Sequence, residues 1–520
     1  MTVIDREVSL QEVAGRKPRT GTLVLVGFFI AYAVLGLIVL THHEPWRDEA
    51  QAWLIARDLT PYQMFFEQMG HEGTPALWHL LNALLIELGL PYAAQAYLNF
   101  AFAVATVGLI FWRAPFPPFL KILFAFNYYM AYEFAEIARN FALGTFLLTA
   151  VLALFEQRHR RSILFAVAVA FLANANVFTF LMAIAFGLIF AVEAVRDRRI
   201  GPALLPALVM AAGGLFAFVQ MIPAADNFRT EGAIGMFNMF MPEHVVQAAF
   251  DLFFGLFEYK ARELAQRWPI AGLLIPAMAV FCATFWLLFL LYIRKSWAAL
   301  LFFAIVAGNI LYIVVFKKGG LPRVHGHLLI AAMGALWLQA LLHQPVATLR
   351  LPWGMTVPAL WLRRAFMVVL CVGLGLSVAR TGQHWYKDIR YPFSGAENMA
   401  AYLRESGLDA RPIVAYESAW GSAVLPYLAR DTMFYYPDLQ RFGSFLVWTR
   451  QWRARYEGLP FDEILRSAEA GIGTLEGVLF LMSHPVDDPR VELLHEAAQH
   501  VNRETLYLYR LRGAAPKAVP

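Results

Sequence analysis

Long apolar stretches separated by short polar segments are the most regular feature of the chain. Stretches such as Thr22–Leu40 and Ile270–Ile293 are long enough to cross a hydrocarbon layer of about 30 Å at about 1.5 Å per helical residue. The pattern predicts a polytopic α-helical membrane protein with eleven transmembrane helices. The expected spans are 22–40, 95–112, 117–133, 140–157, 162–178, 179–195, 200–222, 268–293, 296–316, 326–343 and 363–381.

Basic residues beside these stretches set the predicted orientation. Arg16, Lys17 and Arg19 precede the first span, so the positive-inside rule places residues 1–19 in the cytoplasm and the residues after Leu40 outside. Eleven spans put every later basic cluster on the cytoplasmic side. Those clusters are Arg113 with Lys121, Arg158 with Arg160 and Arg161, Arg196 with Arg198 and Arg199, Arg294 with Lys295, and Arg350 with Arg363 and Arg364.

The transmembrane region is expected to cover residues 20–381, with large outer loops at 42–94 and 223–267. Thr74–Leu90 is long enough to span but carries His79, Asn82 and Glu87, and a twelfth span would invert the side of all later clusters. We therefore expect an amphipathic helix in the outer interface.

The composition changes to that of a soluble domain after about residue 380. Segments 412–418, 431–436, 477–483 and 504–512 are typical of short strands, and 423–428, 461–470 and 491–501 have helical spacing. The alternation predicts a soluble α/β domain over residues 382–512, on the outer, periplasmic side, followed by a tail at 513–520.

Composition narrows the function classes. Apolar residues make up 59% of the 520 residues and charged residues 16%, which excludes a soluble enzyme, a fibrous protein or a disordered chain. The net charge of +5 lies largely beside the apolar stretches, so it indicates topology and argues against nucleic acid as a partner. Cys282 and Cys371 both fall in apolar stretches without the spacing of a metal or redox pair.

The densest cluster of ionisable residues near a membrane face is His42–Trp53, directly after the first span. Pro45 is suited to begin a helix, in whose first turn Asp48 and Glu49 would point about 100° apart. One carboxylate can then face a site while the other orients it. The alternative is a solvated helix start whose acidic residues only favour the helix dipole.

Two other clusters of ionisable residues lie in predicted outer segments. His71, Glu72 and His79 could join Asp48 or Glu49 as metal ligands, although HxxxH and HExxH spacings are absent from this segment. Arg139 follows two acids, Glu133 and Glu136, with which it could instead form a local ion network.

The segment Lys317–His327 places Lys317, Lys318, Arg323 and His325 on the side where the positive-inside rule predicts few cations. A phosphate would explain them, because Arg and Lys neutralise it and the intervening glycines let the backbone approach it. A basic loop without a ligand is the alternative. An outer acid beside outer cations can move a group from a lipid phosphate to a hydroxyl, with the acid as general base.

The pattern resembles the membrane-embedded C-type glycosyltransferases (GT-C), particularly the branch of protein O-mannosyltransferases and aminoarabinose transferases. The resemblance covers residues 20–345 by layout and rests on Asp48 and Glu49 in PWRDEAQAW, Pro75 in HEGTPALWHLLNALL, and Arg139 in ARNFALG. The family usually has His-Pro-Pro where this chain has HEGTP. Some members carry a soluble outer C-terminal domain.

This resemblance implies roles for the residues above. Asp48 would be the catalytic base, and Glu49 an acid that supports it or binds a metal; a divalent metal held by Asp48, Glu49 and His71 is an open alternative. The donor would be a sugar on a polyprenyl phosphate, transferred with inversion at the outer face of a bacterial inner membrane. The sugar stays open, as does the acceptor, which is a glycolipid, a polysaccharide or a protein.

Two other functions fit parts of the pattern. A transporter or flippase for a lipid-linked glycan would also have many spans, but it tends to place ionisable residues near mid-membrane in related halves. An O-antigen ligase or polymerase would share the lipid-linked donor and the basic outer loop without needing Asp48.

Overall fold

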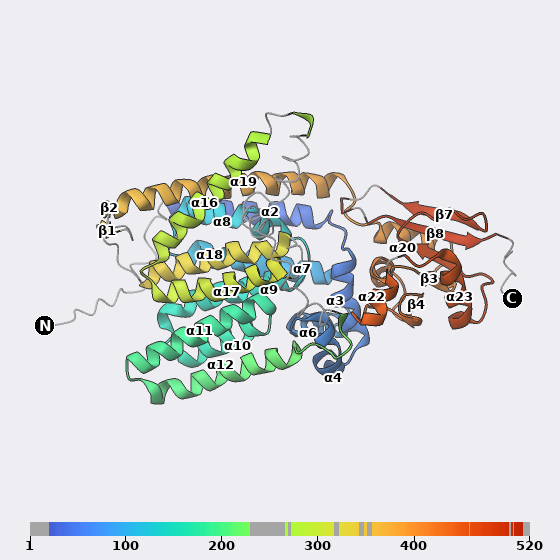
Figure 1. Ribbon diagram of the computed structural model, residues 1–520, viewed down its shortest axis with the longest axis horizontal. Helices are drawn as coiled ribbons and strands as arrows, with labels where there is room; N and C mark the ends of the chain where they lie inside the picture. The colour runs from blue at the N-terminus through green and yellow to red at the C-terminus, as the bar shows by residue number, and fades with distance from the viewer. Residues whose placement is uncertain are drawn as a thin grey trace.

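A computed structural model describes residues 20–228, 266–268, 272–316, 322–342, 348–350, 356–456, 458–498, 501–502 and 504–512. These residues form a helical bundle and a C-terminal domain, with a group of short helices between them (Figure 1). The N-terminal segment 1–19, most of the predicted outer loop 223–267, and the tail lie outside the described residues.

The bundle contains long apolar helices. They are α2 (Thr20–Leu40), α7 (Ala94–Arg113), α8 (Pro118–Phe126), α9 (Asn140–Leu154), α10 (Ser162–Ala173), α11 (Val177–Arg196), α12 (Ile200–Gln220), α16 (Leu274–Ile293), α17 (Trp297–Phe316), α18 (Pro322–Leu342) and α19 (Ala359–Arg390).

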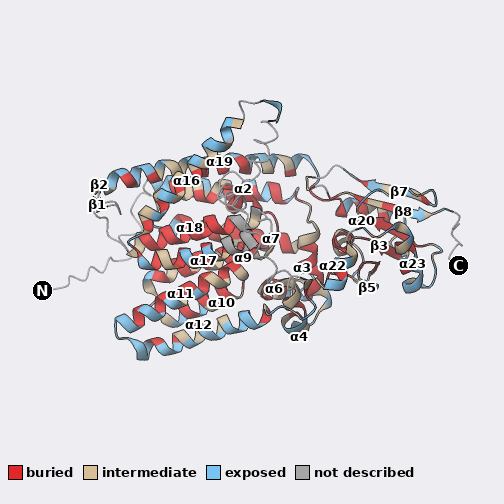
Figure 2. Cartoon of the chain, in the orientation of Figure 1, coloured by how far each residue is buried: buried red, intermediate tan, exposed pale blue. Residues whose placement is uncertain are grey.

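Seven helices in the described part of the chain, namely α2, α7, α9, α11, α12, α16 and α19, are long and apolar enough to cross a membrane. Large apolar side chains stay exposed on their outer faces (Figure 2), such as Leu204, Leu208 and Leu215 of α12, each more than 50% exposed. The chain is a multi-pass membrane protein.

Two asparagines divide the helices differently from the prediction. The expected span 117–133 is split, because Asn127 is extended and its Oδ1 accepts the backbone N–H of Tyr129 at 3.0 Å, which begins the π-helix η2 (Tyr129–Glu133). Asn176 likewise caps α11, accepting the N–H groups of Phe178 and Thr179 at 3.0 Å. The preceding helix therefore ends at Ala173 rather than at the predicted residue 178.

The predicted outer loop 42–94 is mostly helical. It contains α3 (Arg47–Asp58), α4 (Pro61–Gln63), the π-helix η1 (Met64–Gln68), α5 (Met69–Glu72) and α6 (Leu77–Glu87). The 11 residues of α6 extend about 16 Å, which is too short to cross the hydrocarbon layer. This length fits an interfacial helix, and the side of the membrane on which it lies stays a prediction.

The helix α19 connects the bundle to the C-terminal domain without a break (Figure 1). It runs for 32 residues, so the predicted domain boundary at residue 382 falls inside a continuous helix that ends at Arg390. The last turns carry Trp385 and Asp388, which contact the bundle side of the junction: Trp385 Nε1 donates to the Ala131 carbonyl at 2.9 Å.

The C-terminal domain is built on a six-stranded mixed sheet with the order β5-β4-β3-β6-β8-β7. Strand β3 pairs in parallel with β4 and β6, and the β8 strand is antiparallel to both β6 and β7. The strands are β3 (Ile413–Ala415), β4 (Phe434–Tyr436), β5 (Arg441–Gly443), β6 (Leu479–Met482), β7 (Val491–Ala497) and β8 (Leu506–Leu511), and the helical segments are α20 (Ala396–Glu405), α21 (Ser418–Gly421), η7 (Ser422–Tyr427), α22 (Arg450–Tyr456) and α23 (Phe461–Ile472).

The four strands predicted in this domain are present, but the helix predicted at 491–501 is wrong. Residues Val491–Ala497 form the edge strand β7, paired with β8 from Val491 opposite Leu511 to Ala497 opposite Leu506. The ladder places Val491 and Ala497 in the core, so tertiary pairing overrides the helical spacing.

The helix α3 shares one hydrophobic core with the C-terminal domain. Ala50, Trp53 and Leu54 pack in the same cluster as Met399 and Phe434, and all five are buried. The segment that carries Asp48 and Glu49 is thereby fixed to the C-terminal domain as well as to the bundle.

Candidate active site

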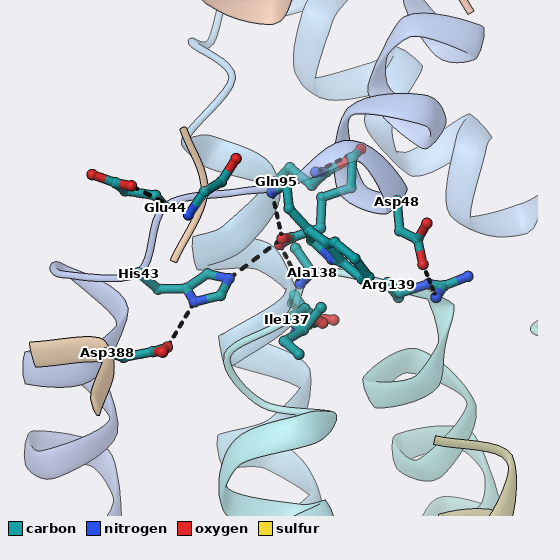
Figure 3. Close-up of polar contacts among 12 residues, drawn as sticks. His43, Glu44, Asp48, Gln95, Ile137, Ala138, Arg139 and Asp388 are labelled. Atoms are coloured by element: carbon teal, nitrogen blue, oxygen red, sulfur yellow. Dashed lines mark hydrogen bonds and ion pairs between the residues drawn. The ribbon is translucent and has the colours of Figure 1, made fainter. Parts of the chain in front are cut away.

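Asp48 lies in the first turn of α3 and contacts two arginines from distant parts of the chain. Its Oδ2 is 2.6 Å from Nη1 of Arg139, which directly precedes α9, and 3.0 Å from Nη2 of Arg323 in the first turn of α18 (Figure 3 draws the Arg139 contact). The side chains of Asp48, Arg139 and Arg323 are 21%, 26% and 19% exposed. The structure thus brings together three residues that the sequence had placed in separate clusters.

The charges of this group favour an anion. Two guanidinium groups face one carboxylate, which leaves an excess of one positive charge. Burial, together with the smaller effect of the neighbouring Arg323, lowers the pKa of Arg139 to about 10, so Arg139 is still protonated at neutral pH. A phosphate could take over guanidinium hydrogen bonds that Asp48 now accepts, because both ligands present oxygens to the same planar donors.

Glu49 lies beneath the site and is fully buried. Its Oε1 accepts the Ala138 backbone N–H at 2.6 Å, and its Oε2 accepts the Trp46 N–H at 3.1 Å and contacts His43 Nε2 at 3.3 Å. Glu49 therefore fixes the start of α3 to the segment before Arg139. It sets the position of the reactive groups and does not line the cavity described below.

His43 extends this buried chain to the end of α19. Its Nδ1 is 2.8 Å from Oδ2 of Asp388 (Figure 3), and the other Asp388 oxygen accepts the Tyr132 hydroxyl at 2.9 Å. Burial lowers the pKa of His43, but the Glu49 and Asp388 carboxylates raise it more, and the net pKa is well above the usual value. A protonated His43 donates from both ring nitrogens and joins three elements under the site.

Two further acids lie at the junction of the bundle and the C-terminal domain. The Ser394 backbone N–H donates to Glu44 Oε2 at 3.4 Å, and its hydroxyl donates to Glu504 Oε2 at 2.6 Å. Burial raises the pKa of Glu44 and of Glu504 to about 7. This junction is therefore expected to change charge near neutral pH.

Asp48, Arg139 and Arg323 line a cavity of about 490 Å³, a size usual for a small-molecule site. One wall comes from the ends of the bundle helices, including Asn140, Phe141 and Phe178. A second wall comes from residues 72–79 of the outer loop. The C-terminal domain supplies the remaining wall, which is formed by Ala419, Leu446, Trp448, Trp452 and Tyr456.

Glu72 lines this cavity and joins it to the C-terminal domain. Its Oε1 accepts hydrogen bonds from Gln51 Nε2 at 2.8 Å, Gln68 Nε2 at 3.0 Å and Trp448 Nε1 at 3.2 Å. Gln51 also exchanges two hydrogen bonds of 2.9 Å with the backbone of Leu446. Glu72 therefore organises the wall rather than presenting a metal ligand.

His71, another predicted site residue, lies apart from Asp48. His71 Nε2 contacts Oδ1 of Asp226 at 2.8 Å, outside the cavity lining. The alternative ion network around Arg139 is not formed, because Arg139 pairs with Asp48 and the Glu133 carboxylate accepts the Tyr128 hydroxyl at 2.7 Å.

No group of three His, Cys, Asp or Glu side chains suited to a metal ion occurs in the part of the chain that the structure describes. Asp48, Glu49 and His71 face three different surroundings and do not fit a shared metal. Lys317 and Lys318, with the side chain of His325, lie outside the described residues.

The sequence analysis missed His43, Asp388 and the aromatic residues of the C-terminal wall. His43 and Asp388 are 345 residues apart, and Trp448 lies 376 residues after Glu72. No local spacing marks such pairs. The only available signal was that His43 belongs to the same dense cluster as Asp48.

The chain was compared with known proteins. No protein-family model matches the sequence, and a comparison with curated proteins found no match. A search of solved structures found a similarity to the crystal structure of ArnT from Cupriavidus metallidurans bound to undecaprenyl phosphate. The similarity covers 96% of this chain and 100% of that chain, with 14% sequence identity and a TM-score of 0.46.

Proposed function

We propose that the protein is an inverting GT-C-type glycosyltransferase that transfers a sugar from a polyprenyl-phosphate donor to an acceptor hydroxyl at the outer membrane face. The observation that carries this proposal is Asp48 held between Arg139 and Arg323 in a cavity at the ends of membrane helices. A carboxylate and two cations at one point are the groups that such a transfer needs. The sequence resemblance described above supports the same chemistry.

In the proposed reaction the donor phosphate binds between the two guanidinium groups and displaces them from Asp48. The released carboxylate accepts the proton of the acceptor hydroxyl as its oxygen bonds to the anomeric carbon. The bond from that carbon to the phosphate oxygen breaks at the same time, and its electron pair goes to the phosphate. Arg139 and Arg323 stabilise the negative charge that develops there.

The proposal places this chemistry on the periplasmic side of a bacterial inner membrane, with eleven spans and a cytoplasmic N-terminus. It assigns Glu49 to positioning, through its contacts with the Ala138 and Trp46 backbone. Lys317, Lys318 and His325 stay candidates for further contacts with the phosphate. A metal has no step in this mechanism.

The test is binding of undecaprenyl phosphate, the bare product of such donors, to the full-length protein in lipid nanodiscs. Arg323→Ala should weaken binding by about ten- to a hundredfold, as expected for loss of a charge-assisted hydrogen bond. Arg323→Lys should restore only part, because an ammonium cannot bind two oxygens in one plane. Arg404→Ala on the exposed face of α20 is the matched control and should bind as the unmodified protein does.

A second measurement distinguishes a transferase from a lipid flippase. The unmodified protein should release undecaprenyl phosphate from a lipid-linked sugar when acceptor-containing membranes are supplied. Equal affinities of Arg323→Ala and the unmodified protein, or lipid movement across the bilayer without release of the phosphate, would refute the proposal.

A further inference from the structure

The wall supplied by the C-terminal domain is rich in aromatic side chains. Trp448 and Tyr456 are half-buried and line the cavity, and Trp452 packs between them. The ring centroids of Trp448 and Trp452 are 4.9 Å apart at 83°, and those of Trp452 and Tyr456 are 4.5 Å apart at 38°. These side chains form the part of the C-terminal domain that lines the cavity.

Hydrogen bonds hold this aromatic wall in place. Trp448 Nε1 donates to Glu72 at 3.2 Å, and Trp452 Nε1 donates to the Ser418 hydroxyl at 3.2 Å. Phe228 packs on the other side, with its ring 6.2 Å from Trp448 and 5.8 Å from Trp452. The rings are therefore ordered before a ligand arrives, which lowers the entropy lost on binding.

The neighbouring wall carries two buried polar atoms that lack partners. Trp78 and His79 of α6 line the same cavity and are 1% and 4% exposed. Neither Trp78 Nε1 nor His79 Nδ1 has a hydrogen-bond partner among the described residues. Burial lowers the pKa of His79 to about 4, so its ring is neutral at physiological pH. A buried polar atom without a partner is costly, so a ligand hydroxyl that formed a hydrogen bond with either atom would stabilise this wall.

We infer that these two walls form the acceptor subsite and that the acceptor is a carbohydrate whose pyranose ring packs on Trp448 and Tyr456. The ring C–H groups of a pyranose are slightly positive and suit the negative face of an aromatic ring. Its hydroxyls can satisfy Trp78 and His79. This inference rests on the proposed function and narrows its acceptor to a saccharide, whether free or as the headgroup of a glycolipid.

The position of the wall assigns it to the acceptor rather than to the donor. Arg139 and Arg323 lie at the ends of the bundle helices α9 and α18, where a lipid-linked phosphate arrives from the membrane. Trp448 and Tyr456 come from the C-terminal domain, which lies beyond the end of the bundle in Figure 1. The acceptor must reach Asp48 from this aqueous side.

The experiment measures the binding of small carbohydrates to the full-length protein in nanodiscs by saturation-transfer NMR. The probes are methyl β-D-glucopyranoside, methyl β-D-galactopyranoside and methyl α-D-mannopyranoside, and D-sorbitol serves as an open-chain polyol without a ring face. At least one pyranoside should bind through its ring C–H groups, and sorbitol should not. Trp448→Ala should weaken that binding about tenfold, while Trp448→Phe should keep part of it.

Two other variants sharpen the result. Trp78→Phe removes only an N–H and should weaken binding by about two- to tenfold. Phe442→Ala, on the exposed strand β5 away from the cavity, is the control and should bind the pyranoside normally. Binding of undecaprenyl phosphate to Trp448→Ala, measured in parallel, should be unchanged and also shows that the variant is folded.

Each outcome either supports or refutes the acceptor subsite. Equal pyranoside binding in Trp448→Ala and the unmodified protein, or no binding of any pyranoside, overturns the subsite. Joint loss of pyranoside and undecaprenyl phosphate binding in folded Trp448→Ala overturns its assignment to the acceptor. Trp448-dependent pyranoside binding in a protein that does not bind undecaprenyl phosphate would instead refute the proposed function and leave a carbohydrate site.

Discussion

Replacing Asp48 by asparagine should affect turnover and product binding in opposite directions. Asp48 is the group to which the proposed mechanism gives the acceptor proton, so Asp48→Asn should reduce turnover by about 10²–10⁴-fold. The same carboxylate accepts both guanidinium contacts, at 2.6 and 3.0 Å, and therefore competes with the phosphate. An asparagine keeps the shape but removes the competing charge.

The gain in binding can be worked out from the contacts. A phosphate that occupies the two guanidinium groups would lie about 5 Å from the carboxylate, where two like charges repel by about 3 kcal/mol at an effective dielectric constant of about 20. Asp48 is 21% exposed, so water screens part of this repulsion. Reducing it by about half leaves about 1.5 kcal/mol, or about tenfold tighter binding of undecaprenyl phosphate.

Both quantities are measured on the same nanodisc preparation, as the Kd for undecaprenyl phosphate and as release of that phosphate from a lipid-linked sugar. Asp58→Asn, at the other end of α3, is a matched control because Asp58 also pairs with an arginine, Arg57, at 2.7 Å. It should change neither quantity. Weaker phosphate binding in Asp48→Asn, or turnover close to normal, would show that Asp48 is neither the base nor a competitor of the phosphate.

Three further results are expected. A Cβ at Gly326 would overlap the Tyr129 ring, so Gly326→Ala should displace the start of α18, lower the Tm and weaken undecaprenyl phosphate binding. A Cβ at Gly308 would meet nothing within 4 Å, so the control Gly308→Ala should change neither the Tm nor the binding. Equal behaviour of the two variants would contradict the close packing at Gly326. Burial raises the pKa of Glu504 to about 7 from its usual 4.5, so its ionisation removes up to about 3 kcal/mol of stability as the pH rises from about 4.5 to 7. Glu504→Gln should therefore flatten the fall in Tm between pH 5 and pH 8; an unchanged slope would exclude Glu504 as its source. Leu88 is 65% exposed. In a cysteine-free background, the variant Leu88→Cys should therefore react with an impermeant maleimide added from outside. Labelling only from the cytoplasm would reverse the predicted topology.

The sequence was sufficient for features that depend on local pattern. Apolar stretches located most bundle helices to within about six residues at each end, although α8 ends at Phe126 rather than 133 and α19 at Arg390 rather than 381, and alternation located four strands of the C-terminal sheet. Errors arose where a single side chain determines where a helix starts. Asn127 and Asn176 start new helices inside or beside runs of apolar residues. At Val491–Ala497 the partner strand decides instead, and the helical spacing is irrelevant.

The site was predictable only in part. Asp48, Arg139 and Arg323 could each be singled out by charge at a predicted membrane face, but their shared contact joins positions 91 and more residues apart. The different surroundings of adjacent Asp48 and Glu49 follow from helical geometry, which the sequence does supply. The aromatic wall could not be predicted, because Trp448 and Tyr456 become site residues only through the docking of a separate domain.

The attachment of that domain has a consequence for the order in which the protein matures. The cavity is incomplete until Leu446, held by Gln51, and Trp448, held by Glu72, have been synthesised and docked. These segments emerge from the ribosome nearly 400 residues apart, so a nascent chain that already has all its membrane helices still lacks one side of its reaction chamber. Such a chain could meet donor lipid in the membrane without holding an acceptor beside it. For the proposed reaction, catalytic competence would thus be acquired last, when the C-terminal domain has docked.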